Sequence, residues 1–98
     1  MEVEFDDNEL DRLEIDPQFT AGYSQEIVCA YRRRMQQIRG FRDERDFYAL
    51  KSLHFEKLKG DREGQSSIRL NSQWRLIVEI RGNHPCKLIG IVEIVDYH

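Results

Sequence analysis

The last three residues form the densest group of titratable side chains in the sequence. Asp96, Tyr97 and His98 follow a hydrophobic segment typical of a β-strand, so these side chains and the terminal carboxylate are expected at one edge of a sheet. If the strand stays extended, Asp96 and His98 lie on one face and Tyr97 lies on the other. Such a group could transfer protons, but a frayed polar tail is the alternative, since chain ends are commonly mobile.

Further candidates lie in the middle of the chain. His54 precedes a predicted strand, and Lys57 follows three residues later. Arg69 and Arg75 fall on two neighbouring predicted strands and point away from the apolar sets of those strands, so we expect both on one side of the sheet. The apolar residues assigned to the same side are Ile77, Ile89 and Ile91.

Together these residues supply proton donors, proton acceptors and fixed positive charge, which are the functions that RNA cleavage requires. The 2′-hydroxyl must lose a proton, the phosphorane must be stabilised by cations, and the 5′-oxygen must gain a proton. Histidine suits either transfer near neutral pH, and the planar fork of arginine suits a phosphate. The three histidines lack metal-ligand spacing, and His84 lies in a predicted surface turn, so we predict no metal and no cofactor.

The elements that position these residues are predicted as helices followed by strands. Glu2–Phe5 has the character of a short strand, and two helices are expected over Asp7–Ile15 and from a Ser24 cap to about Arg39, with Gly40 as the stop. A shorter helix is expected from an Asp43 cap to about Leu50. The period then changes to two, which predicts strands over Phe55–Leu58, Ser66–Leu70, Trp74–Ile80 and Lys87–Val95.

This order predicts one α+β domain over residues 1–98, in which an N-terminal strand and two to three helices pack on an antiparallel sheet. No apolar run is long enough for a membrane helix and the acidic start lacks the features of a signal peptide, so we expect a cytoplasmic protein with no membrane partner. Cys29 and Cys86 form no CxxC motif, which gives a zinc site or disulfide framework no support.

Charge is divided unevenly along the chain, whose formal net charge is −3. Residues 1–26 hold nine acidic side chains against Arg12 alone, while the remaining 72 residues carry 14 Lys and Arg against nine acids. The basic body could bind a polyanion if the acidic segment lies on another face; a solvated charge pattern with no partner is the alternative. For Arg32, Arg33 and Arg34, a solvated helix face and a phosphate-binding face are equally compatible with the sequence.

Two blocks of sequence resemble the HigB-type killer toxins of the RelE/ParE superfamily. The first is the pattern GDRxGxxSIRxNxQWR, which begins at Gly60 and ends at Arg75, and the second is the terminal VDYH over residues 95–98. Strong similarity covers roughly His54 to Leu76 and the last five residues, while the first half agrees mainly in layout.

The resemblance implies a RelE-like, microbial-RNase-type fold and a ribosome-dependent mRNA endonuclease that is restrained by a HigA-like helix-turn-helix antitoxin. It implies mRNA and the ribosome as the other partners. Carried over by position, it implies catalytic roles for His54, Arg75, Asp96, Tyr97 and His98, and RNA-binding roles for Lys57, Arg62, Arg69 and Asn71. Two alternatives stay open: a toxin of the same fold that targets gyrase, and a non-catalytic module that binds RNA or the ribosome.

Overall fold

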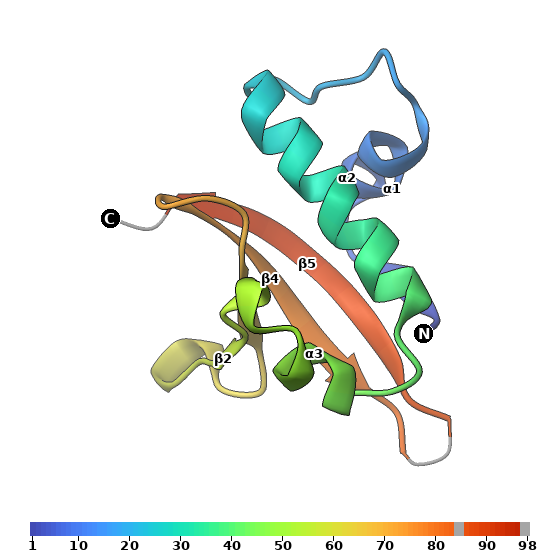
Figure 1. The fold of residues 1–98 in the computed structure, drawn as a ribbon, viewed down its shortest axis with the longest axis vertical. Coiled ribbons are helices and arrows are strands. Elements are labelled where there is room, and N and C mark those ends of the chain that lie inside the picture. The colour runs from blue at the N-terminus through green and yellow to red at the C-terminus, as the bar shows by residue number, and fades with distance from the viewer. Residues whose placement is uncertain (84–85, 97–98) are drawn as a thin grey trace.

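The computed structural model describes residues 1–83 and 86–96. Its elements follow the predicted order of one strand, three α-helices and four further strands (Figure 1). The α-helices are α1 (Asn8–Ile15), α2 (Gln25–Gly40) and α3 (Arg45–Ala49), and the strands are β1 (Val3–Phe5), β2 (Glu56–Lys57), β3 (Ser66–Arg69), β4 (Trp74–Arg81) and β5 (Leu88–Asp96). Two short 3₁₀ turns that the sequence pattern did not reveal are η1 (Lys51–Leu53) and η2 (Gly60–Arg62).

The helix starts follow from local hydrogen bonding. Asp7 accepts from the backbone N–H of Glu9, and Ser24 caps α2 by accepting from the N–H of Ile27. The predicted stop at Gly40 is wrong by one residue, because Gly40 is still helical and Phe41 turns into an extended conformation. The predicted cap residue of α3, Asp43, lies two residues before the helix. Its carboxylate accepts from the backbone N–H of Arg45, which is the first residue of α3.

Helix α2 is fastened to the N-terminal segment by buried polar contacts as well as by apolar packing. The hydroxyl of Tyr31, fully buried, donates to the carbonyl oxygen of Leu10 at 2.7 Å. The guanidinium of Arg32 donates to the carbonyls of Leu13, Asp16 and Phe19. Arg32 is therefore a structural residue that satisfies the end of α1 and the following loop, and it is not a solvated side chain.

The five strands form one mixed sheet in the order β1-β5-β4-β3-β2. The predicted α+β class and antiparallel body are confirmed, and β1 adds one parallel pairing with β5. One face of the sheet carries Ile68, Leu76, Val78, Ile91 and Ile94, which join the buried side chains of the helices in a single hydrophobic cluster. We call the opposite face, which carries Arg69 and Arg75, the outer face.

A β-bulge overturns the predicted placement of Ile89 and Ile91. The register between β4 and β5 shifts between Ile77 and Val78, which leaves Val92 without a direct partner. The alternation of β5 is thereby inverted, so Ile89 and Ile91 lie in the hydrophobic cluster while Glu93 and Val95 lie on the outer face. Ile77 does lie on the outer face as predicted, and it is fully buried there.

Within the described part of the chain, no helix combines the length and apolar character needed to cross a bilayer.

Candidate functional site

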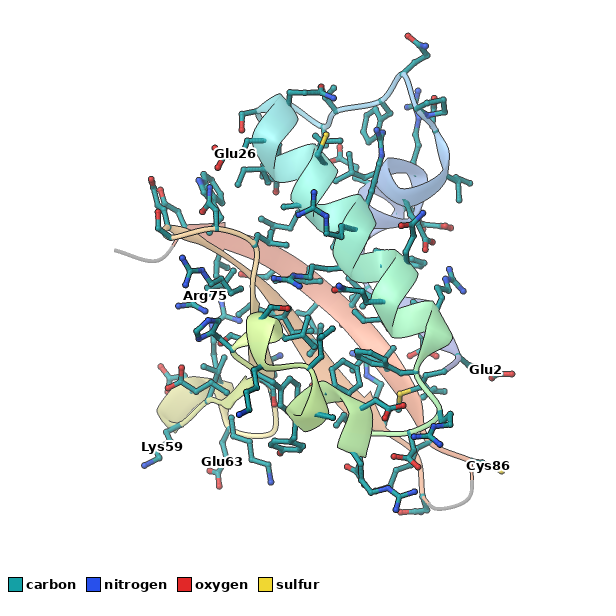
Figure 2. All side chains as sticks on the ribbon, viewed as in Figure 1. Glu2, Glu26, Lys59, Glu63, Arg75 and Cys86 are labelled. Atoms are coloured by element: carbon teal, nitrogen blue, oxygen red, sulfur yellow. The ribbon has the colours of Figure 1, made fainter. Side chains whose placement is uncertain are left out.

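Two arginines from neighbouring strands stand side by side on the outer face. Arg69 and Arg75 are directly opposite each other in the antiparallel pairing of β3 with β4, which confirms that they share one side of the sheet. Figure 2 shows Arg75 on the side away from α2. Among residues 1–83 and 86–96, no acidic side chain forms an ion pair with either arginine, so two positive charges lie side by side and neither is paired within this part of the chain.

The guanidinium of Arg75 holds a buried donor with no partner. Its Nη1 is inaccessible to solvent and makes no hydrogen bond to any residue that the structure describes, although Arg75 as a whole is only half-buried. A buried donor without a partner is costly, and such groups are concentrated at functional sites. The arrangement is suited to an oxygen-rich anion such as a carboxylate or a phosphate, which could accept two parallel hydrogen bonds from the planar guanidinium.

The family of the chain follows from comparison with known proteins. A protein-family model described as "RelE-like toxin of type II toxin-antitoxin system HigB" matches residues 3–98. The chain belongs to the HigB-like toxins. A solved structure, "YoeB/ParE toxin from Agrobacterium tumefaciens", is similar in fold, with a TM-score of 0.61, 16% identity and 100% coverage of both chains. No curated protein matches the sequence significantly.

In this HigB-like toxin, the turn before β3 folds over the outer face. Arg62 donates to the carboxylate of Glu93 on β5 at 2.8 Å, and to the side-chain oxygen of Gln65. Because β4 lies between β3 and β5, the Arg62 side chain reaches across the sheet. The positive charge of Arg62 is thus near the site but is paired with Glu93.

Asn71 shapes the hairpin that joins β3 to β4. Its side-chain oxygen accepts from the backbone N–H groups of Gln73 and Trp74, at 2.9 and 2.7 Å. Asn71 therefore has a structural role, because it fixes the turn that sets Arg69 opposite Arg75. Asparagine before a short polar link is a turn signal that sequence reasoning could have used in this way.

Asp96 lies at the end of β5 beside the same hairpin, although it is not on the face of Arg75. Its backbone partner is Trp74, and the partner of Arg75 is Val95, so alternation directs Asp96 to the opposite face. Both carboxylate oxygens accept from the side-chain amide of Gln73 at 3.0 Å. Gln73, which sequence reasoning missed as a contact, thus joins the hairpin to the C-terminal strand. Tyr97, His98 and His84 lie outside the described residues.

His54 is exposed at the end of η1, and Arg34 holds this segment against β3. The guanidinium of Arg34 donates to the carbonyl of Arg69 at 2.9 Å and to the carbonyl of Ser52 at 2.9 Å. His54 itself has a positive φ of 47°, in the left-handed region. Burial, followed by the charges of Arg33 and Arg69, lowers the pKa of Arg34. Arg34 thus has a structural role, as Arg32 does, and Arg33, between them in the sequence, is exposed.

Lys57 and Arg75 lie on opposite faces of the sheet. Lys57 pairs with Ser66 on β3, and Ser66 pairs with Val78 of the hydrophobic cluster, so Lys57 belongs to the face opposite the two arginines. There it lines a cavity of about 540 Å³ together with Ile80 and the Lys87–Glu44 ion pair, among others. The cavity and the arginine pair are therefore separate features of this HigB-like toxin.

Three carboxylates of the acidic N-terminal segment are paired with arginines other than Arg69 and Arg75. Glu4 and Asp6 bind Arg81 at the end of β4 remote from Arg75, and Glu14 binds Arg39 on α2. Six residues of strand separate Arg75 from Arg81, about 20 Å at the usual rise. That separation exceeds the Debye length of about 8 Å at physiological salt, so the repulsion between these acids and an anion at Arg75 is largely screened.

Proposed function

We propose that this HigB-like toxin is a metal-independent, ribosome-dependent endonuclease that cuts messenger RNA in the cytoplasm and so arrests growth. The observation that carries the proposal is the juxtaposition of Arg75 and Arg69, neither of which forms an ion pair within residues 1–83 and 86–96, together with a buried Arg75 nitrogen that has no partner there. A phosphodiester provides the oxygen acceptors that such a pair lacks, and RNA provides one beside a 2′-hydroxyl.

In the proposed reaction, the 2′-oxygen attacks the adjacent phosphorus as a general base removes its proton. The bond from phosphorus to the 5′-oxygen breaks, a general acid protonates that oxygen, and a 2′,3′-cyclic phosphate and a 5′-hydroxyl result. Arg75 stabilises the negative charge that develops on the phosphorane. His54, Tyr97 and His98 are the candidates for the two proton transfers, because the alternation of β5 directs Asp96 to the face opposite Arg75.

The distribution of charge supports RNA on the ribosome as the target. The outer face at Arg69 and Arg75 has no acidic partner among residues 1–83 and 86–96, whereas the acids of β1 and the loop after it are occupied by Arg81. Phosphate contacts made by such residues release counterions, which predicts binding that weakens with salt. Asn71 and Arg62 then border the RNA, with Arg62 already paired to Glu93.

A type II toxin implies an antitoxin partner, and we propose one of the HigA type with a helix-turn-helix domain. The DNA next to the toxin gene should then encode a reading frame of about 100 codons with this pattern, since helix-turn-helix modules are small single domains. Co-expression of that frame should restore growth, and purification of the tagged toxin should recover its product. A neighbouring frame that does neither removes this assignment of the partner.

Mapping RNA 5′ ends after induction tests the proposed reaction. Wild type should create new ends inside translated messages within minutes, and a pretreatment that stops translation should prevent them. A His98→Ala variant should produce no new ends while melting at the wild-type temperature. Growth arrest with no new RNA ends but with DNA damage would instead assign the chain to gyrase inhibition. Salt-sensitive RNA binding without growth arrest would leave a non-catalytic binding module.

A further inference from the structure

Ser67, in the middle of the outer face, is a second buried polar group without a partner. It is fully buried on β3, and its hydroxyl makes no hydrogen bond to any described residue. Serine is a poor choice for a packed interior position, because an unpaired hydroxyl there loses its bonds to water. The contrast with Ser66 is direct, since Ser66 lies on the other face and none of its side-chain atoms is a buried orphan.

The register of the sheet makes Ser67 a diagonal neighbour of Arg75. Ser67 pairs with Ile77, and Arg69 pairs with Arg75, so Ser67 and Arg75 lie on the same face one pairing step apart. Diagonal neighbours have Cβ atoms about 7–8 Å apart, which a long side chain can span. The two groups are chemically complementary, because the guanidinium nitrogen only donates and a hydroxyl oxygen can accept.

The outer face also explains why neither group is solvated. The Arg62–Glu93 ion pair crosses the sheet at the row formed by Ser67, Ile77 and Glu93, and Ser67 and Ile77 are both fully buried. Water in bulk therefore does not reach the hydroxyl. Both unpartnered atoms, the Ser67 hydroxyl oxygen and Arg75 Nη1, are thus buried on the same face in diagonal positions.

We propose that Ser67 is a positioning residue for Arg75. A single bridging water accepts from Nη1 of Arg75 and donates to the Ser67 hydroxyl, and this link holds the guanidinium so that its other donors face the phosphate. The role in cleavage rests on the proposed function, whereas the contact itself does not. A guanidinium held at one end keeps its geometry in the transition state, where displacement by about 1 Å can cost on the order of 100-fold in rate.

A comparison of Ser67→Ala with Ser66→Ala tests this proposal, because the same change is made at adjacent residues on opposite faces. Rotation about the Cζ–Nε bond of Arg75 can be measured by NMR of the guanidinium nitrogens in each full-length protein. We expect slow rotation in wild type and Ser66→Ala, and faster rotation in Ser67→Ala. In a translating-ribosome cleavage assay, Ser67→Ala should lower kcat about 10-fold with little change in KM, and Ser66→Ala should leave both unchanged.

The two measurements separate the two claims. Unchanged rotation of Arg75 in Ser67→Ala overturns the contact. Faster rotation with an unchanged kcat overturns the positioning role. If wild type cuts no RNA on the ribosome, the proposed function fails, and the NMR comparison alone decides whether Ser67 holds Arg75.

Discussion

Two arginines of strand β4 lie on the same face of the sheet and differ in nearly every other respect. Arg81 donates to three carboxylates, those of Glu4, Asp6 and Glu79, at 2.6 to 2.9 Å. Arg75, six residues earlier, has a buried Nη1 with no partner and lies beside another arginine. The hydrogen bond with Asp6, then that with Glu79, raises the pKa of Arg81.

The difference separates an arginine that stabilises the fold from one that is available to a ligand. Arg81 joins β1 to β4 through charge-assisted hydrogen bonds, so its interaction energy is used within the native state. Arg75 makes no such contact with the described residues, and its buried Nη1 adds a desolvation cost. Stability is commonly sacrificed in this way where a group must bind something else.

The largest expected effect is on activity, from Arg75→Ala. Loss of one preorganised donor at a developing charge should lower the cleavage rate by about 100-fold or more, and growth arrest should disappear. The free energy of unfolding should change by less than about 0.5 kcal/mol, because the guanidinium forms no ion pair and no direct hydrogen bond with any described residue. Arg33→Ala, an exposed arginine of α2, is the matched control and should remain toxic. Wild-type toxicity in Arg75→Ala would remove the distinction between the two arginines.

The opposite pattern is expected for Arg81→Ala. Removing the guanidinium leaves Glu4, Asp6 and Glu79 close together without a counter-charge, and should lower the free energy of unfolding by about 2 kcal/mol. Urea denaturation measures the change, and activity per folded molecule should stay near that of wild type. A stable but inactive Arg81→Ala protein would mean that the far end of the face also takes part in function.

A smaller effect is expected from Gly90→Ala on β5. An added Cβ would lie 2.3 Å from Cζ of Arg81, so the guanidinium would have to move away from its carboxylates. We expect a loss of about 1 kcal/mol, since the displaced group is the end of a long side chain. In the Arg81→Ala background the same change should cost almost nothing, because the obstacle is gone. Additive losses in the double variant would show that Gly90 is needed for another reason.

The smallest expected effect is on the melting temperature at acidic pH. The hydrogen bond from Arg81 lowers the pKa of Asp6 from its ordinary 3.8, against the opposing effect of partial burial. The stability contributed by this carboxylate is therefore complete above about pH 4 and is lost as pH falls through the lowered pKa. The difference in melting temperature between wild type and Arg81→Ala should narrow from pH 7 to pH 3. Asp43, whose pKa Arg45 lowers to about 2, contributes equally to both proteins and cancels. A difference that stays constant with pH would contradict the ion pair.

The sequence sufficed for most of the fold and for the core of the site, for identifiable reasons. The change of hydrophobic period separated helices from strands, and strict alternation in β3 and β4 placed Arg69 and Arg75 on one face. The bulge at Val92 could not be predicted, because one extra residue inverts the alternation without leaving a composition signal. The error at Ile89 and Ile91 follows from it.

The hydrogen-bond partners of the arginines could not be predicted from the sequence either. Arg32 and Arg34 look alike in a run of three, yet both use their donors on backbone carbonyls that come near only after folding. The pairing of Arg62 with Glu93 joins residues 31 positions apart. Tertiary contacts therefore decide which arginine can bind a ligand, and composition alone does not distinguish the structural arginines from the others.

The most direct test of this account is the initial rate at which purified protein cuts a defined message on translating ribosomes. Wild type, Arg75→Ala and Arg81→Ala should be compared at equal concentrations of folded protein. We expect wild type and Arg81→Ala to cut the message at similar rates, and Arg75→Ala to cut it at a rate at least about 100-fold lower. Equal cleavage by Arg75→Ala and wild type would contradict it.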